Sequence, residues 1–230
     1  MPSPEQRREQ LVELYREVRA CMRCPLGQTR TQAVFGAGNA NADLMFVGEA
    51  PGAQEDAQGI PFVGRAGQLL NELLAENGLS RDDVFIANVL KSRPPGNRDP
   101  QPEEIDACKP YLYRQVELIE PTVICTLGNF STKLLTRSQT GISRVHGVPQ
   151  VHQVGGRTVQ IFPIFHPAAG LRTPSVKESL REDFRKLPAL LAAGPPPQPD
   201  AAEASAASAS TGPPEAAAEA SAPDQLDFFE

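Results

Sequence analysis

Short apolar runs alternate with amphipathic segments along most of this chain, and that alternation constrains the fold more than any other feature. The runs cover residues 43–47, 84–88, 122–126 and 158–165. Runs this short that are apolar at nearly every position are typical of strands buried on both faces. Strands that alternate with helices form parallel sheets, so the sequence predicts an α/β domain with a mainly parallel central sheet.

The segments between these runs place apolar residues at helical spacing, which predicts helices. The expected helices span residues 5–20, 65–77, 103–119, 130–135 and 176–191, with loops at 94–102 and 138–147. In open sheets of this kind, ligands bind beyond the carboxyl ends of the strands. Those ends lie at residues 48–52, 88–93, 128 and 166–167, and they carry most of the residues capable of chemistry.

The charge of the chain divides into two unequal parts. The formal net charge is −6, which taken alone argues against a polyanionic partner such as DNA. Seven acidic residues and no Lys or Arg follow residue 190, which leaves 22 basic and 21 acidic residues, a charge of +1, on residues 1–190. The remainder is rich in Ala, Pro, Ser and Glu, a composition that cannot bury a core. We therefore predict a folded domain at 1–192 and a disordered tail at 193–230.

Two observations indicate a soluble, intracellular protein. Residues 1–20 are too highly charged for a secretory signal, and no apolar run approaches the roughly 20 residues that a membrane span needs. Four cysteines in such a chain are a poor disulfide set, because reducing compartments keep thiols free. Metal binding or catalysis is therefore expected of them.

The cysteines have a spacing that suits a metal site. Cys21 and Cys24 form a C-x2-C pair at the end of a predicted helix, and Cys108 and Cys125 fall on a later helix and strand. Together they could supply four thiolates to one tetrahedral site, for zinc or for an iron–sulfur cluster, and the spacing does not separate the two. Cys108 and Cys125 could equally be small core residues.

Five side chains at successive strand ends or in the following loops form a possible ligand pocket. Glu49 and Glu55 flank a glycine-rich exit from the first strand and could orient a water, although a solvated loop would look the same. Phe62 lies in a turn-rich stretch, where it could stack on a planar ligand or anchor the core. Asn88 could read the edge of a base or cap a loop, and His166 ends the last strand.

Five motifs resemble those of the family 4 uracil-DNA glycosylases, which are iron–sulfur enzymes of base-excision repair. The resemblance covers roughly residues 10–190 and is carried by Gly-Glu-Ala-Pro-Gly-x-x-Glu-Asp from residue 48, Gly-Ile-Pro-Phe-Val-Gly-Arg-Ala-Gly from 59, Asn-Val-Leu-Lys-x-Arg-Pro-Pro-x-Asn-Arg from 88, Ile-Cys-Thr-Leu-Gly from 124 and His-Pro-Ala-Ala from 166.

The resemblance implies the uracil-DNA glycosylase fold, with a central parallel four-stranded sheet flanked by helices. It also implies a structural [4Fe–4S] cluster and so favours iron–sulfur over zinc. The ligands would be the four cysteines, Cys21, Cys24, Cys108 and Cys125.

The same resemblance assigns the pocket residues. Phe62 would stack on uracil flipped out of the DNA, Asn88 would read its edge, and His166 would hydrogen-bond uracil O2 as charge develops there. Gly48 and Ala50 would line the pocket, with Glu49 and Glu55 as candidates for holding the water or the sugar. The expected activity is hydrolysis of the N-glycosidic bond, and the alternative is an iron–sulfur protein that binds uracil-DNA without cleaving it.

Two departures from related enzymes bear on the reaction. Ala50 stands where family 1 enzymes carry a water-activating aspartate, so a single dedicated base is not expected. A related group traps the sugar covalently through a histidine in a basic insertion, and residues 94–102 contain no histidine. We therefore expect hydrolysis with turnover.

We expect a monomeric, cytoplasmic and nucleoid-associated enzyme that acts on single- and double-stranded DNA. Several residues outside the pocket are expected to contact DNA or a protein partner. Leu171 resembles the residue that wedges into the minor groove. The basic residues expected to contact DNA are Arg65, Lys91, Arg93, Arg98, Arg144 and Arg172. The peptide Gln225, Leu226, Asp227, Phe228, Phe229 resembles the motif by which bacterial repair proteins dock on the sliding clamp, with the tail as a tether.

Overall fold

Residues 3–198 of the chain are described by a computed structural model. The part of the predicted tail that begins at residue 199 lies outside them. The clamp-binding peptide Gln225, Leu226, Phe228 and Phe229 lies outside them as well, so both stay predictions.

A six-stranded sheet forms the centre of the molecule, in the order β1-β3-β2-β4-β6-β5. The four inner strands β3, β2, β4 and β6 run parallel, as the resemblance implies, and β1 and β5 pair antiparallel at the two edges. The strands are β1 (Ala37–Gly38), β2 (Leu44–Gly48), β3 (Val84–Asn88), β4 (Val123–Leu127), β5 (Gln150–Val154) and β6 (Arg157–Ile164). Every residue of β2, β3 and β4 is buried, which explains why these strands read as continuous apolar runs.

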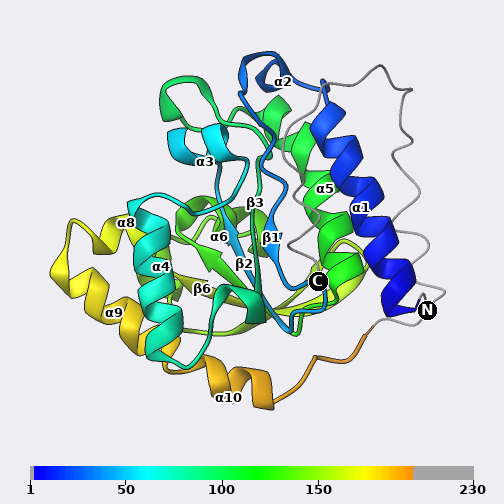
Figure 1. Ribbon diagram of the computed structural model, residues 1–230. Coiled ribbons are helices and arrows are strands. Elements are labelled where there is room, and N and C mark those ends of the chain that lie inside the picture. The colour runs from blue at the N-terminus through cyan, green and yellow to red at the C-terminus, as the bar shows by residue number, and fades with distance from the viewer. Residues whose placement is uncertain (1–2, 199–230) are drawn as a thin grey trace.

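Helices cover both faces of the sheet, which gives three layers (Figure 1). The helices are α1 (Pro4–Ala20), α2 (Leu26–Thr29), α3 (Ala53–Gln58), α4 (Arg65–Glu76), α5 (Pro102–Ile119), α6 (Asn129–Thr136), α7 (Ile142–Val145), α8 (Pro167–Gly170), α9 (Pro174–Phe184) and α10 (Leu187–Ala192), with 3-10 turns at Arg81–Asp83 and Pro95–Asn97. α1 and α5 pack on one face around Leu11, Leu112 and Met45. α4, α9 and α10 pack on the other around Leu73 and Phe184.

The described helices and strands differ from the predicted ones in a few places. The single helix predicted at 176–191 is two helices, because Pro188 lacks the N–H that a continuous helix would need there. β5 was missed because it is an edge strand whose residues are mostly exposed or half-buried. The loop predicted at 138–147 contains the short helix α7.

The carboxyl ends of the parallel strands meet at one end of the molecule, where α2, α3 and the loop before α5 gather (Figure 1). There Gly48 of β2 is the register partner of Asn88 of β3. The residues expected to form the pocket therefore start from adjacent strand ends. No helix within residues 3–198 combines the length and the apolar character that crossing a membrane requires.

Candidate active site

Gly48, Phe62 and Asn88 meet at the carboxyl edge of the sheet. A Cβ atom on Gly48 would lie 2.3 Å from Asn88 Oδ1 and 2.7 Å from Phe62 Cζ, so only glycine fits between them. Asn88 is 2% exposed, and its Oδ1 is buried with no hydrogen-bond partner among the described residues. A buried carbonyl oxygen without a donor is costly, which makes it a position prepared for a ligand N–H.

Contacts to the Phe62 backbone fix the position of its ring. Its φ of 53° is in the left-handed region, which is strained for a bulky residue. Arg81 donates from Nη1 to Phe62 O at 3.1 Å and from Nη2 to Pro61 O at 2.7 Å. Helix α4 approaches so closely that a Cβ on Gly67 would lie 1.7 Å from Phe62 O. These contacts fix the aromatic face in the pocket, and nothing in the sequence signals the part played by Arg81.

Glu55 shapes the same loop. Its Oε1 accepts from the backbone N–H groups of Val63 and Gly64, both at 2.9 Å, and its Oε2 accepts from Gly52 N–H at 3.1 Å. The expectation that Glu55 holds the water or the sugar is therefore not supported by its geometry. With three backbone donors on its carboxylate, Glu55 closes the loop that carries Phe62.

His166 faces Phe62 from the end of β6, with the two ring centroids 5.7 Å apart. It caps α8, and its Nδ1 accepts from Ala168 N–H at 3.1 Å. Burial, and next the positive charge of Arg172, lower the pKa of His166 to about 4. The ring is therefore neutral at pH 7, and because Nδ1 is an acceptor, the proton sits on Nε2.

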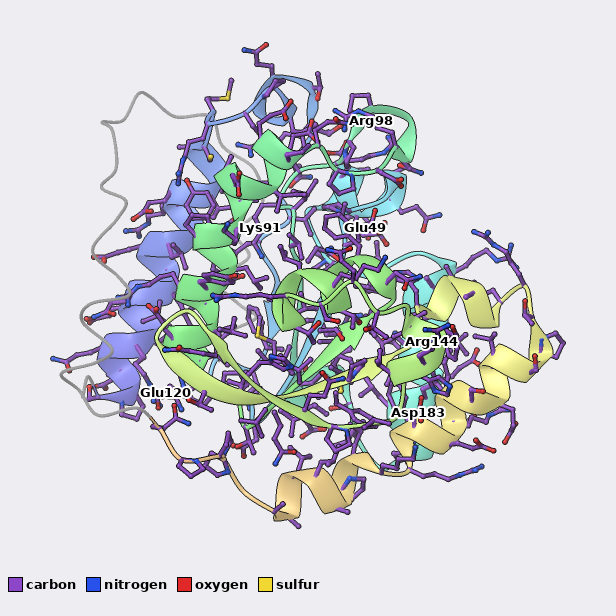
Figure 2. All side chains as sticks on the ribbon, turned by 180° about the vertical axis from the view of Figure 1, so that it is seen from behind. Glu49, Lys91, Arg98, Glu120, Arg144 and Asp183 are labelled. Atoms are coloured by element: carbon purple, nitrogen blue, oxygen red, sulfur yellow. The ribbon has the colours of Figure 1, made fainter. Side chains whose placement is uncertain are left out.

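Glu49 directly follows Gly48 at the strand end, and within residues 3–198 its carboxylate accepts no hydrogen bond from the backbone. It is half-buried, and burial together with the nearby charge of Asp99 raises its pKa. Figure 2 shows Glu49 at the same end of the molecule as Arg98. Ala50, which follows it, is half-buried and offers no functional group.

Lys91 does not lie on the surface, so its expected contact with DNA is wrong for this structure. Its side chain is 1% exposed, and its Nζ donates to Asn88 O at 2.8 Å, Gln115 Oε1 at 2.7 Å and Phe35 O at 3.1 Å. Burial lowers the pKa of Lys91 to about 7. Figure 2 shows Lys91 inside the molecule, beside α5. Its role is to fix the backbone of Asn88.

The other basic residues expected to contact DNA differ in whether their side chains already have partners within the protein. Arg65, Arg144 and Arg172 are exposed, and within residues 3–198 none of their side chains makes a hydrogen bond or ion pair. Arg93 is half-buried and donates from Nε to Asn97 Oδ1 at 2.7 Å. Arg98 pairs with the buried Glu104 and so holds the loop before α5.

Leu171 is 39% exposed, which is unusual for a leucine in this domain. It follows directly after α8, the short helix that His166 caps. The predicted wedge and the predicted pocket donor thus flank one turn of helix.

The four cysteines do not come together. Cys24 and Cys108 hydrogen-bond to each other through their side chains, and Cys21 hydrogen-bonds to Tyr111 on α5. Cys125 lies in the apolar layer on the opposite face of the sheet. Within residues 3–198, no group of three or more His, Cys, Asp or Glu side chains is arranged to hold a metal ion. The four-cysteine set therefore does not fit one cluster in this structure.

The protonation of His166 can be measured directly. Because its lowered pKa favours the neutral ring, we expect no titration of His166 between about pH 5 and 8. The measurement is nitrogen-15 NMR of the imidazoles, with the His166 signals assigned by their loss in His166→Gln. A midpoint near the ordinary histidine value of about 6.5 would contradict the burial argument.

The placement of Lys91 predicts a split between stability and DNA binding. Lys91→Met should lower the free energy of unfolding by about 1–3 kcal/mol, because three buried acceptors lose their donor. Binding to uracil-free DNA should stay unchanged. Arg172→Met is the matched control, which should weaken DNA binding without loss of stability. Weaker DNA binding in a fully stable Lys91→Met would restore Lys91 as a DNA contact.

The comparisons with known proteins agree with this geometry. Residues 35–187 match the uracil DNA glycosylase superfamily. The type-4 uracil-DNA glycosylase of Archaeoglobus fulgidus is 48% identical over 183 residues, which cover 78% of this chain and 92% of the relative. Those of Saccharolobus solfataricus and Thermotoga maritima are 48% and 45% identical over 184 and 183 residues, covering 78% of this chain and 85% and 94% of the relatives. The chain therefore belongs to the type-4 family of uracil-DNA glycosylases.

Proposed function

We propose that this protein removes uracil from DNA by hydrolysing the bond between uracil N1 and the deoxyribose C1′. The observation that carries the proposal is the buried, unpartnered Oδ1 of Asn88 beside the ring of Phe62. Uracil flipped out of the duplex offers an N–H donor at N3 and a flat face, which match these two groups.

Asn88 supplies selectivity for uracil over cytosine. Its Oδ1 accepts from uracil N3–H, while its amide N–H groups can donate to uracil O4. Cytosine presents an acceptor at N3 and a donor at the exocyclic amine, which is the opposite pattern. Binding cytosine would leave a buried polar group unpaired, at a cost of about 1–3 kcal/mol. Lys91 keeps the Asn88 backbone in register for this readout.

His166 and Glu49 act on the two charges that form as the bond breaks. The base leaves as an anion, and the neutral His166 donates its Nε2–H to uracil O2. The sugar becomes cation-like, and the Glu49 carboxylate stabilises it and orients the water. The water oxygen bonds to C1′, and its proton balances the charge of the released uracil.

Turnover requires that no side chain stays bonded to the sugar. Glu55 is engaged by three backbone N–H groups, and the loop at residues 94–102 contains no histidine to trap the sugar. With water as the proposed nucleophile, the products are free uracil and an abasic site.

DNA would approach the end of the molecule that holds the strand ends. The exposed side chains of Arg65, Arg144 and Arg172 are available for phosphates, and Leu171 would fill the gap left by the flipped nucleotide. Single- and double-stranded DNA would both be substrates, since uracil in a single strand needs no wedge.

Four further properties belong to the same proposal. The cofactor is a [4Fe–4S] cluster, as the motifs imply, and the protein acts as a monomer. It works in the cytoplasm at the nucleoid. The peptide Gln225, Leu226, Phe228, Phe229 docks it on the sliding clamp.

The proposal predicts release of free uracil from a single-stranded oligonucleotide that contains one deoxyuridine. His166→Ala should slow single-turnover release by about 100-fold or more, because the developing anion loses its donor. The readout is strand cleavage at the abasic site by alkali, together with chromatography of the released base. His152→Ala is the matched control, since His152 lies on the edge strand β5, and it should cleave like the wild type.

The same assay separates the alternative, a protein that binds uracil-DNA without cleaving it. Such a protein would retain the uracil oligonucleotide more tightly than the thymine one and release no base. Equal rates for His166→Ala and wild type would remove His166 from the reaction while leaving the glycosylase activity in place.

A second prediction concerns the wedge. Leu171→Ala should slow cleavage of double-stranded DNA about tenfold and leave single-stranded DNA unaffected, because only the duplex must be held open. Val151→Ala, at another exposed apolar residue that is 60% exposed on β5, is the control. An equal loss on both substrates would instead indicate a folding or pocket defect.

A further inference from the structure

Three of the four cysteines share one face of the sheet. Cys21 caps the end of α1, Cys24 directly precedes the turn into α2, and Cys108 lies in the second turn of α5. The side chains of Cys24 and Cys108 are in hydrogen-bond contact. All three cysteines pack on the core between α1, α5 and the sheet.

Backbone amides point at two of these sulfur atoms. The N–H groups of Leu26 and Gly27 donate to Cys24, and that of Lys91 donates to Cys108. Hydrogen bonds to the sulfur atoms are one of the means by which a protein tunes an iron–sulfur cluster. The third thiol, that of Cys21, is hydrogen-bonded to the side chain of Tyr111, which lies three residues after Cys108 on α5. Among residues 3–198 the three thiols are not grouped to hold a metal ion, so binding one centre would require Cys21 to give up its hydrogen bond to Tyr111.

Cys125 is separated from this group by the sheet itself. Its register partners on β2 and β6 are Phe46 and Phe162, and all three belong to the core under α4 and α9. Ile124, the preceding residue, faces the opposite core. Bringing Cys125 to the other cysteines would require β4 to slip by one residue, which would move its whole apolar set to the wrong face. Cys125 is a core thiol.

Ser92 is a buried polar residue one position along the chain from the backbone N–H that donates to Cys108. It follows Lys91, whose N–H meets Cys108, and it is 3% exposed. Arg30 donates from Nη1 to Ser92 Oγ at 3.0 Å and from Nη2 to Arg19 O at 2.5 Å, two residues before Cys21. Arg30 thus ties Ser92 to the chain segment that carries Cys21.

We propose that the iron–sulfur centre of this chain is held by the thiolates of Cys21, Cys24 and Cys108, with Ser92 Oγ at the fourth iron and Cys125 uninvolved. The proposal rests on the proposed function for the identity of the cofactor. An oxygen ligand is harder than a thiolate, so it makes one iron differ from the other three. That iron is the one expected to be lost first on oxidation.

The experiment uses the full chain purified without oxygen and enriched in iron-57. Iron and acid-labile sulfide per chain, the visible absorbance and the Mössbauer spectrum are measured for wild type, Cys125→Ala, Cys108→Ala and Ser92→Cys. Cys125→Ala should keep the iron content of the wild type, whereas Cys108→Ala should lose more than half. Ser92→Cys should abolish the distinct iron signal and slow bleaching in air severalfold.

Loss of iron in a folded Cys125→Ala would overturn the proposal, with circular dichroism as the test of folding. Cys125→Val, which keeps the apolar core filled, replaces Cys125→Ala if the latter fails to fold. Identical Mössbauer spectra for wild type and Ser92→Cys would overturn the role of Ser92, and wild-type protein without iron would overturn the site. Uracil release, measured in parallel, keeps these outcomes distinct from failure of the proposed activity.

Discussion

The parallel alignment of β2 and β3 is the constraint on which the rest of the site depends. It places Gly48 opposite Asn88, and the missing side chain of Gly48 is what lets the Asn88 amide and the Phe62 ring approach each other so closely. A register shift of one residue would turn the Asn88 side chain to the other face of the sheet. The juxtaposition of Gly48, Phe62 and Asn88 is therefore a property of strand pairing.

Three charged side chains near the site serve as supports for backbone groups. Lys91 donates hydrogen bonds to two backbone carbonyls and a buried side-chain amide, and Arg81 donates to the carbonyls of Pro61 and Phe62. Glu55 accepts hydrogen bonds from three backbone N–H groups. Such groups are buried at a cost that only full hydrogen bonding offsets. Each of these side chains fixes a loop that has no regular secondary structure. An enzyme can thereby hold its polar groups in position before the substrate binds.

Helices and strands could be predicted from the sequence because they depend on the periodicity of apolar residues. The placement of individual side chains could not, because it depends on which way each side chain points. Strand Val84–Asn88 and the strand-end position of His166 followed from short apolar runs, whose burial leaves little choice of structure. A strand apolar on both faces does not reveal which face a given residue takes, so Cys125 could be grouped with cysteines on the other side. Lys91 was expected on a surface loop at the DNA because its sequence context does not reveal that its side chain is buried.

The four-residue helix α8 joins two tasks that are usually described separately. His166 caps its start and Leu171 follows its end, so the proposed donor to the base and the proposed wedge are separated by one turn of helix. A displacement of Leu171 on entering the base stack would therefore act on the turn that holds the imidazole, which would couple extrusion of the nucleotide to the position of the donor.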